Sequence, residues 1–137
     1  MKFVVAFFIM WSVYACKSKE LSKVPDDLVG KWKMTSQQVT KDGIVEWQDV
    51  PEKDSIYMFF SRYGEYVTSN GLVLPCGPSS LRINGSFHKI EFHSEPFISI
   101  ILGLCAECPT WDLELDETRL ILQRCSPNSK MLFVKVD

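Results

Sequence analysis

The sequence predicts an all-β protein, an antiparallel barrel or sandwich of about eight to ten short strands. Three observations predict this fold class. Beyond Asp27, apolar and polar residues alternate with a period of two rather than 3.6. Turn pairs such as Asp42-Gly43 and Asn84-Gly85 recur at close spacing. No stretch carries a helical repeat of useful length, and 137 residues suit one domain.

The predicted strands follow one another along the chain, each ended by turn-forming residues. The first strand places Trp32 and Met34 on one face, and the third is rich in aromatic residues. Two prolines surround Cys76 in residues 72–78, which favours irregular backbone there. In chain order the predicted strands are 29–39, 44–48, 56–61, 65–69, 81–83, 87–93, 97–103, 111–115, 118–124 and 131–136.

Two hairpin registers follow from matching apolar faces, since a slip by one residue turns every side chain over. In the hairpin 87–103, the matched pairs are Phe92 with Ile98, Ile90 with Ile100, and His88 with Leu102. In the hairpin 111–124, a turn at Asp116-Glu117 pairs Leu113 with Leu120 and Trp111 with Leu122. The second register, carried outward, places Cys108 opposite Cys125.

The cysteines indicate an exported chain with disulfides. Apart from Cys16 there are four, an even number that favours two bonds. The hairpin register predicts Cys108–Cys125, which leaves Cys76–Cys105 as the second bond. A local Cys105–Cys108 bond stays open as an alternative. The Cys105-x-x-Cys108 spacing is also typical of a redox pair or of half of a zinc site. We expect no metal, because the two histidines are not spaced as further ligands.

The first residues have the pattern of an export signal. Lys2 precedes an apolar run too short to span a bilayer as a helix, and Ala15 is a small residue before a cleavage point. With Cys16 following at once, the segment resembles a bacterial lipoprotein signal, which implies cleavage before Cys16 and acylation of its thiol. The predicted division is a signal peptide over 1–15, a tether over 16–27 and a domain over 28–137. Ordinary secretion, with an unmodified Cys16, is the alternative.

The domain itself resembles the lipocalin superfamily. Gly30-x-Trp32 lies on the first strand, the aromatic run 57–60 and Gly64-Glu65-Tyr66 follow, and 131–136 closes the chain. These features are similar to small lipocalin-like lipoproteins of the Bacteroidetes group. The resemblance implies an eight-stranded up-and-down β-barrel, in which Trp32 plugs the closed end and Gly30 lets the chain bend. The second lipocalin motif is missing. The arginine that stacks on the first-strand tryptophan in that family has no clear match, and Arg119 and Arg124 are candidates by position only.

The function implied is binding of a small apolar or amphipathic molecule inside the barrel. The candidate ligand-binding residues are Trp47, Tyr57, Tyr66, His88 and Phe92. Each has a structural alternative, since aromatic residues on strands are commonly core residues. Two other functions stay open: a protein-interaction module with a filled core that acts through its rim loops, and a redox or metal-stress sensor built on Cys105-x-x-Cys108.

Composition and motifs exclude several function classes. The formal net charge is −2 with no basic stripe, which argues against nucleic-acid binding. The sequence has neither a nucleophile motif, a zinc-protease motif nor a phosphate loop, so we predict neither enzyme activity nor a cofactor. We expect a monomer in the bacterial cell envelope, attached to the membrane through lipid on Cys16. Lys17 favours the outer membrane by analogy with enteric sorting.

Overall fold

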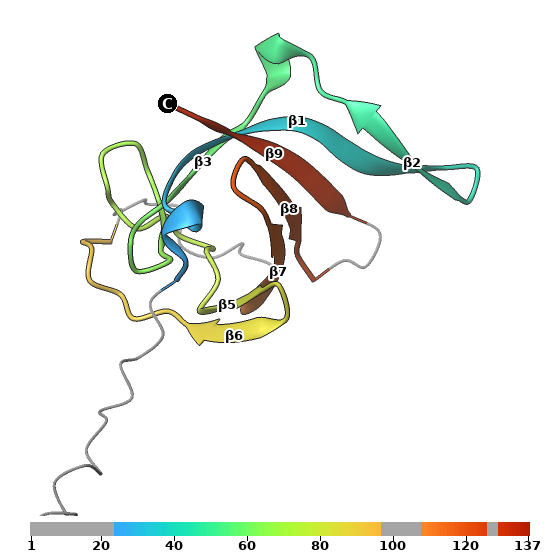
Figure 1. Ribbon diagram of the computed structural model, residues 1–137. Coiled ribbons are helices and arrows are strands. Elements are labelled where there is room, and N and C mark those ends of the chain that lie inside the picture. The colour runs from blue at the N-terminus through green and yellow to red at the C-terminus, as the bar shows by residue number, and fades with distance from the viewer. Residues whose placement is uncertain (1–23, 97–107, 126–128) are drawn as a thin grey trace, which may run out of the picture.

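The computed structural model describes residues 24–96, 108–125 and 129–137. This part of the chain is all-β, with one strongly curled sheet that forms a half-barrel (Figure 1). Its helical elements are two single 3-10 turns, Asp26–Leu28 and Glu52–Asp54. The strands are β1 (Gly30–Lys41), β2 (Ile44–Asp49), β3 (Tyr57–Phe60), β4 (Tyr66–Val67), β5 (Ser80–Ile83), β6 (Ser86–Lys89), β7 (Thr110–Leu115), β8 (Arg119–Gln123) and β9 (Lys130–Val136).

The sheet is mixed, so the prediction of a wholly antiparallel sheet is wrong. Its strand order is β4-β3-β1-β9-β8-β7-β5-β6, and β2 pairs with β1 beside this path. Every pairing is antiparallel except that of β5 with β7. A parallel pair needs a long connection between its strands. The chain between Ile83 and Thr110, which includes β6, supplies that length.

The predicted strand 87–93 is shorter in the structure. β6 ends at Lys89, and the backbone N–H of Ile90 then donates to the carbonyl of Ser79. His88 lies opposite Leu81 of β5. The predicted strand 97–103, and with it the register of the 87–103 hairpin, falls outside the described residues.

The predicted register of β7 and β8 is wrong by two residues. Leu113 lies opposite Leu122, and Leu115 lies opposite Leu120. The reason is the turn, where Asp116 Oδ1 accepts hydrogen bonds from the backbone N–H groups of Thr118 and Arg119. These bonds make Asp116 the last residue before the turn, so the turn residues are 117 and 118 instead of the predicted 116 and 117. A shift of two preserves the faces, so the leucines still point into the core.

The predicted bond between Cys108 and Cys125 is confirmed. Their Cα atoms are 5.5 Å apart, and the bond joins the chain before β7 to the chain after β8. The local bond between Cys105 and Cys108 is therefore not formed. Cys76 is also disulfide-bonded, whereas Cys105, its predicted partner, lies outside the described residues.

Trp32 is fully buried where the start of the domain folds across one end of the half-barrel. Its indole N–H donates to the carbonyl of Leu28 at 2.8 Å. The ammonium of Lys135 lies 5.5 Å from the indole ring and donates to the carbonyl of Asp27 at 2.7 Å. Gly30 has φ of 125°, a conformation open to glycine, where β1 leaves this end. The structural roles expected of Trp32 and Gly30 stay a prediction.

The concave face of the sheet carries one hydrophobic core. Its buried members are Val24, Leu28, Trp32, Met34, Met58, Phe60, Leu81, Ile83, Ile90, Trp111, Leu113, Leu120, Leu122 and Phe133. Val24 precedes the predicted start of the domain. It packs against Gly64, whose φ is 78° and where an added Cβ would lie 2.7 Å from Val24 Cγ1. The residues just before Leu28 therefore belong to the folded unit.

Candidate functional site

The β1–β2 hairpin extends beyond the curled sheet (Figure 1). β1 is 12 residues long, and its pairing with β9 ends at Gln37. Past that point its described strand partner is β2, up to the pair of Lys41 with Ile44. Asp42 and Gly43 have φ of 52° and 80°, which a two-residue turn of this twist requires. The sequence thus builds a projecting two-stranded ribbon.

All six residues of β2 are exposed. The exposed fraction is 62% for Ile44 and 47% for Trp47, and Val45 is exposed as well. Because side chains alternate along a strand, Val45 and Trp47 share one face of the ribbon and Ile44 lies on the other. Large apolar residues therefore meet solvent on both faces of the same strand.

One edge of β2 is open, since β2 pairs with β1 alone among the described strands. The backbone N–H of Val50 donates to the carbonyl of Thr35 at 2.9 Å, which fixes the phase of the ladder. In an antiparallel pair the hydrogen-bonded residues alternate. The N–H and C=O groups of Val45, Trp47 and Asp49 therefore point to the open edge.

The structure places three of the five predicted ligand-binding residues on the surface. Trp47 lies on β2, Tyr57 on β3 and Phe92 beyond β6, and all three are exposed. The ammonium of Lys31 lies 4.6 Å from the ring centre of Tyr57. These three side chains thus come from separate elements.

The other two predicted residues pack against the core. Tyr66 is partly buried, with its ring centre 5.4 Å from that of Trp111, and His88 is buried. Arg124 covers Trp111 at 4.6 Å from its ring centre, and Arg119 pairs with Asp116. These arginines, the positional candidates for stacking on the first-strand tryptophan, thus have other partners.

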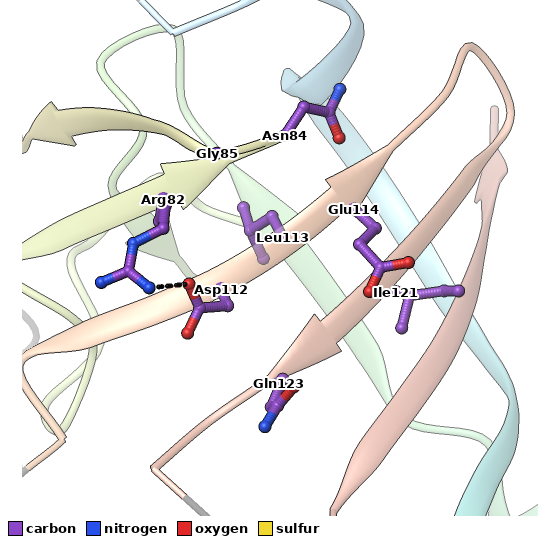
Figure 2. A pocket seen from close by; sticks show the side chains of 8 residues that line it. All are labelled: Arg82, Asn84, Gly85, Asp112, Leu113, Glu114, Ile121 and Gln123. Carbon is purple, nitrogen blue, oxygen red and sulfur yellow. Dashed lines mark ion pairs between the residues drawn. The ribbon is translucent and has the colours of Figure 1, made fainter. Parts of the chain in front are cut away.

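A surface hollow of about 310 Å³ lies over β5, β7 and β8. Figure 2 shows the side chains that line it. Its charged side chains neutralise one another and their neighbours: Arg82 pairs with Asp112 at 3.1 Å, and Glu114 pairs with Lys130 at 2.8 Å. The amide of Asn84 bonds to the backbone of β7. None of the five predicted ligand-binding residues lines it. Its lining residues are Arg82, Asn84, Gly85, Asp112, Leu113, Glu114, Ile121 and Gln123.

Glu65 is a fully buried carboxylate that sequence reasoning did not select. Its carboxylate accepts hydrogen bonds from the backbone N–H groups of His93 and Ser94, at 2.6 and 2.8 Å, and from the hydroxyls of Ser61 and Ser94, at 2.7 and 2.8 Å. Burial raises the pKa of Glu65, but these bonds together outweigh it, so the pKa lies below its ordinary value. The group is satisfied by the protein itself, which indicates a structural role.

The described residues hold no group of three His, Cys, Asp or Glu side chains that could bind a metal ion. Within the same residues, no helix has the length and apolar character needed to cross a membrane.

Comparison with known proteins gives no match to a family model, to a curated protein or to a solved structure. The class of the protein is thus defined by its geometry. It is an all-β half-barrel with a projecting hairpin, whose outer strand exposes Ile44, Val45 and Trp47 and pairs with β1 alone among the described strands.

Proposed function

We propose that this protein is an interaction module of the bacterial cell envelope that binds an extended segment of a partner protein along the open edge of β2. The observation that carries the proposal is the combination, on one strand, of unpaired backbone groups and exposed Ile44, Val45 and Trp47. Peptides that add a strand to a sheet edge gain affinity from main-chain hydrogen bonds and specificity from alternate side chains.

Natural sheets protect their edges, which supports a partner for this one. Common protections are proline, a bulge, a charged inward residue or a covering loop. β2 carries no proline, and its ladder with β1 runs without a register shift from Ser36–Asp49 to Lys41–Ile44. A regular edge that exposes three large apolar side chains, Ile44, Val45 and Trp47, is a liability unless another chain covers it.

The filled interior favours an interaction module over a carrier of small molecules. Trp32, Trp111 and Phe133 are among the largest buried side chains, and they occupy the concave side of the sheet. A carrier needs an apolar void of some hundreds of Å³.

The proposed barrel is lipocalin-like: burial of Trp32 beneath Lys135 and the conformation of Gly30 are consistent with the first-strand motif.

Export with lipid on Cys16 is part of the proposal. Disulfides persist mainly in oxidising compartments, so the bond between Cys108 and Cys125 is consistent with a location outside the cytoplasm. The same bond disfavours a sensor that cycles Cys105 with Cys108. An acylated Cys16 would hold the module at a membrane, and stable attachment there requires more than one acyl chain.

The test is to select partners and then remove one edge donor. A phage-displayed library of random linear peptides is panned against the full chain. Val45→Pro deletes the N–H that faces the open edge, while proline is tolerated there because that group makes no bond to β1. Val45→Thr is the matched control, since it keeps the N–H and the β-branched shape.

We expect selected peptides to bind wild type and Val45→Thr, and to lose most of their affinity for Val45→Pro. Circular dichroism and the melting temperature verify that both variants fold. Equal affinity for all three proteins, or failure to enrich any peptide, would overturn the proposal.

A further inference from the structure

We infer that the segment bound at β2 is basic: an extended strand in which lysine or arginine residues three positions apart stand among apolar residues. This inference rests on the proposed function and names the chemistry of the partner. It comes from the charges around the hairpin, which are independent of the open edge itself.

Carboxylates dominate the hairpin tip and the 3-10 turn that follows it. Residues 41–54 hold five carboxylates and two lysines. Glu52 is committed to Lys33 at 2.8 Å, and Asp49 accepts a hydrogen bond from the hydroxyl of Ser36 at 2.9 Å. Within the described part of the chain, Glu46 forms no ion pair, and the same holds for Asp42. The edge therefore carries uncompensated negative charge.

The carboxylates of β2 lie among its apolar side chains. Asp49 shares a face with Val45 and Trp47, and Glu46 shares the other face with Ile44. A residue directly opposite on a paired strand approaches to about 5 Å. A partner strand would thus meet one carboxylate and at least one apolar side chain on each face.

This arrangement specifies a pattern for the partner. Cations opposite Asp49 and Glu46 would be three positions apart, with apolar residues opposite Trp47, Val45 and Ile44. An arginine beside Trp47 would gain a cation–π contact in addition. An antiparallel partner, read from its N-terminus, has the order basic, any, apolar, basic, apolar, apolar.

The same charges disfavour two other occupants. A second copy of this chain would bring two acidic edges together, and like charges on neighbouring strands are unfavourable. An anionic lipid surface would repel the hairpin although its apolar residues would suit insertion. A basic protein segment satisfies both the apolar residues and the charge.

The experiment compares two synthetic peptides on the full chain carrying Cys16→Ser, which prevents acylation. One peptide follows the pattern above with lysine at both basic positions and valine at the apolar ones, and its counterpart has glutamate in place of lysine. We expect the lysine peptide to bind about tenfold more tightly at low salt. The difference should shrink in high salt, because the charges are exposed.

Charge reversal in the protein provides the matched control. Glu46→Lys with Asp49→Lys should reverse the preference and favour the glutamate peptide. Equal affinity of both peptides for wild type and for the reversed variant, with loss of binding in Val45→Pro, would overturn the charge inference and leave edge binding intact. Binding of neither peptide, or binding unaffected by Val45→Pro, would overturn the edge function as well. Stronger association with phosphatidylglycerol vesicles than with the lysine peptide would also contradict a basic partner.

Discussion

The carboxylate of Glu65 links the β3–β4 turn to residues 93–94 by accepting hydrogen bonds from their backbone N–H groups. β6 ends at Lys89, and the backbone N–H groups of His93 and Ser94 donate to a side chain instead of to a strand. Glu65 accepts both, and the hydroxyl of Ser61 holds the carboxylate in place from its own turn. Nearby, the ring of Tyr63 lies 4.1 Å from that of His93. One side chain thus fastens two segments that are distant in sequence.

Glu65→Gln should destabilise the protein by about 2 to 3 kcal/mol at neutral pH, because an amide nitrogen would face donors and leave a buried N–H without an acceptor. The pKa of Glu65 is lowered in the folded state. Its ionised form therefore contributes stability that is fully present above the unfolded pKa of about 4.3 and is lost as pH falls through the folded pKa. Urea unfolding across this pH range measures the difference between variant and wild type.

Glu91→Gln is the matched control for this prediction, because Glu91 is an exposed carboxylate on the same segment. We expect it to change the free energy of unfolding by less than about 0.5 kcal/mol. The difference for Glu65→Gln should stay constant above pH 5 or so and shrink in more acidic solution. A difference that grew with acid, or none at neutral pH, would show that Glu65 does not hold the two segments.

Among the elements, the long alternating strands follow from the sequence and the connections between distant strands do not. β1 and β7 are predicted within a few residues, because each buries alternate side chains over part of its length. β9 is predicted within one residue, although Phe133 is its one buried residue. The position of β5 beside β7 depends on the path of the chain between them, which period-two patterning does not contain. The register of β7 and β8 depended on the side chain of Asp116, which changes where the turn begins.

The candidate site was predictable only as a residue type. Trp47 stands out in the sequence as an aromatic residue on a strand, and the sequence predicts it as a ligand-binding residue of a barrel. Whether β2 has a neighbour on its second edge is decided by strand order across the whole sheet. The role of the buried Glu65 likewise depends on its contact with His93 and Ser94, which lie 28 and 29 positions further along the chain.

Two proline variants test the assigned phase of the β2 ladder. The N–H of Glu46 points to β1 and that of Val45 to the open edge, so Glu46→Pro should break a ladder bond and Val45→Pro should not. We expect Glu46→Pro to raise the amide exchange rates of residues 38–41 at least about tenfold, whereas Val45→Pro leaves them close to wild type. Hydrogen exchange followed by mass spectrometry measures both. Equal acceleration in the two variants would mean that the ladder has the opposite phase.

On the scale of the whole molecule, three interactions among the described residues join parts of the half-barrel to one another. The buried indole of Trp32 donates to the carbonyl of Leu28, Glu65 joins the β3–β4 turn to the chain beyond β6, and the bond between Cys108 and Cys125 closes the base of the β7–β8 hairpin. Both strands of that hairpin contribute to the core, through Leu113 and Leu122 among others. The disulfide bond therefore joins the ends of two strands that both contribute side chains to the core.

Removal of that covalent closure should lower the free energy of unfolding by about 3 kcal/mol. The bond spans 17 residues, and closing a loop of this length restricts the unfolded chain by that amount in the chain-entropy model. Cys108→Ser combined with Cys125→Ser tests it, because the double change leaves no unpaired thiol at the site. Denaturant unfolding compares the variant with wild type, and peptide mapping without reductant verifies the native pairing.

A full-length Cys105→Ser variant separates this role from a redox function. It removes Cys105 from the Cys105-x-x-Cys108 pair, and with it the predicted bond to Cys76, and leaves Cys108 bonded to Cys125. If the bond between Cys108 and Cys125 is structural, Cys105→Ser retains it in peptide mapping, and mild oxidant or copper does not alter it. The opposite outcome in wild type would contradict a structural bond: mild reductant frees the Cys108 thiol, and oxidation then joins Cys108 to Cys105. Because Cys125 lies after β8 and Cys108 before β7, such an exchange would also have to open the base of the hairpin, and it would appear as a loss of β-sheet signal in step with the thiols.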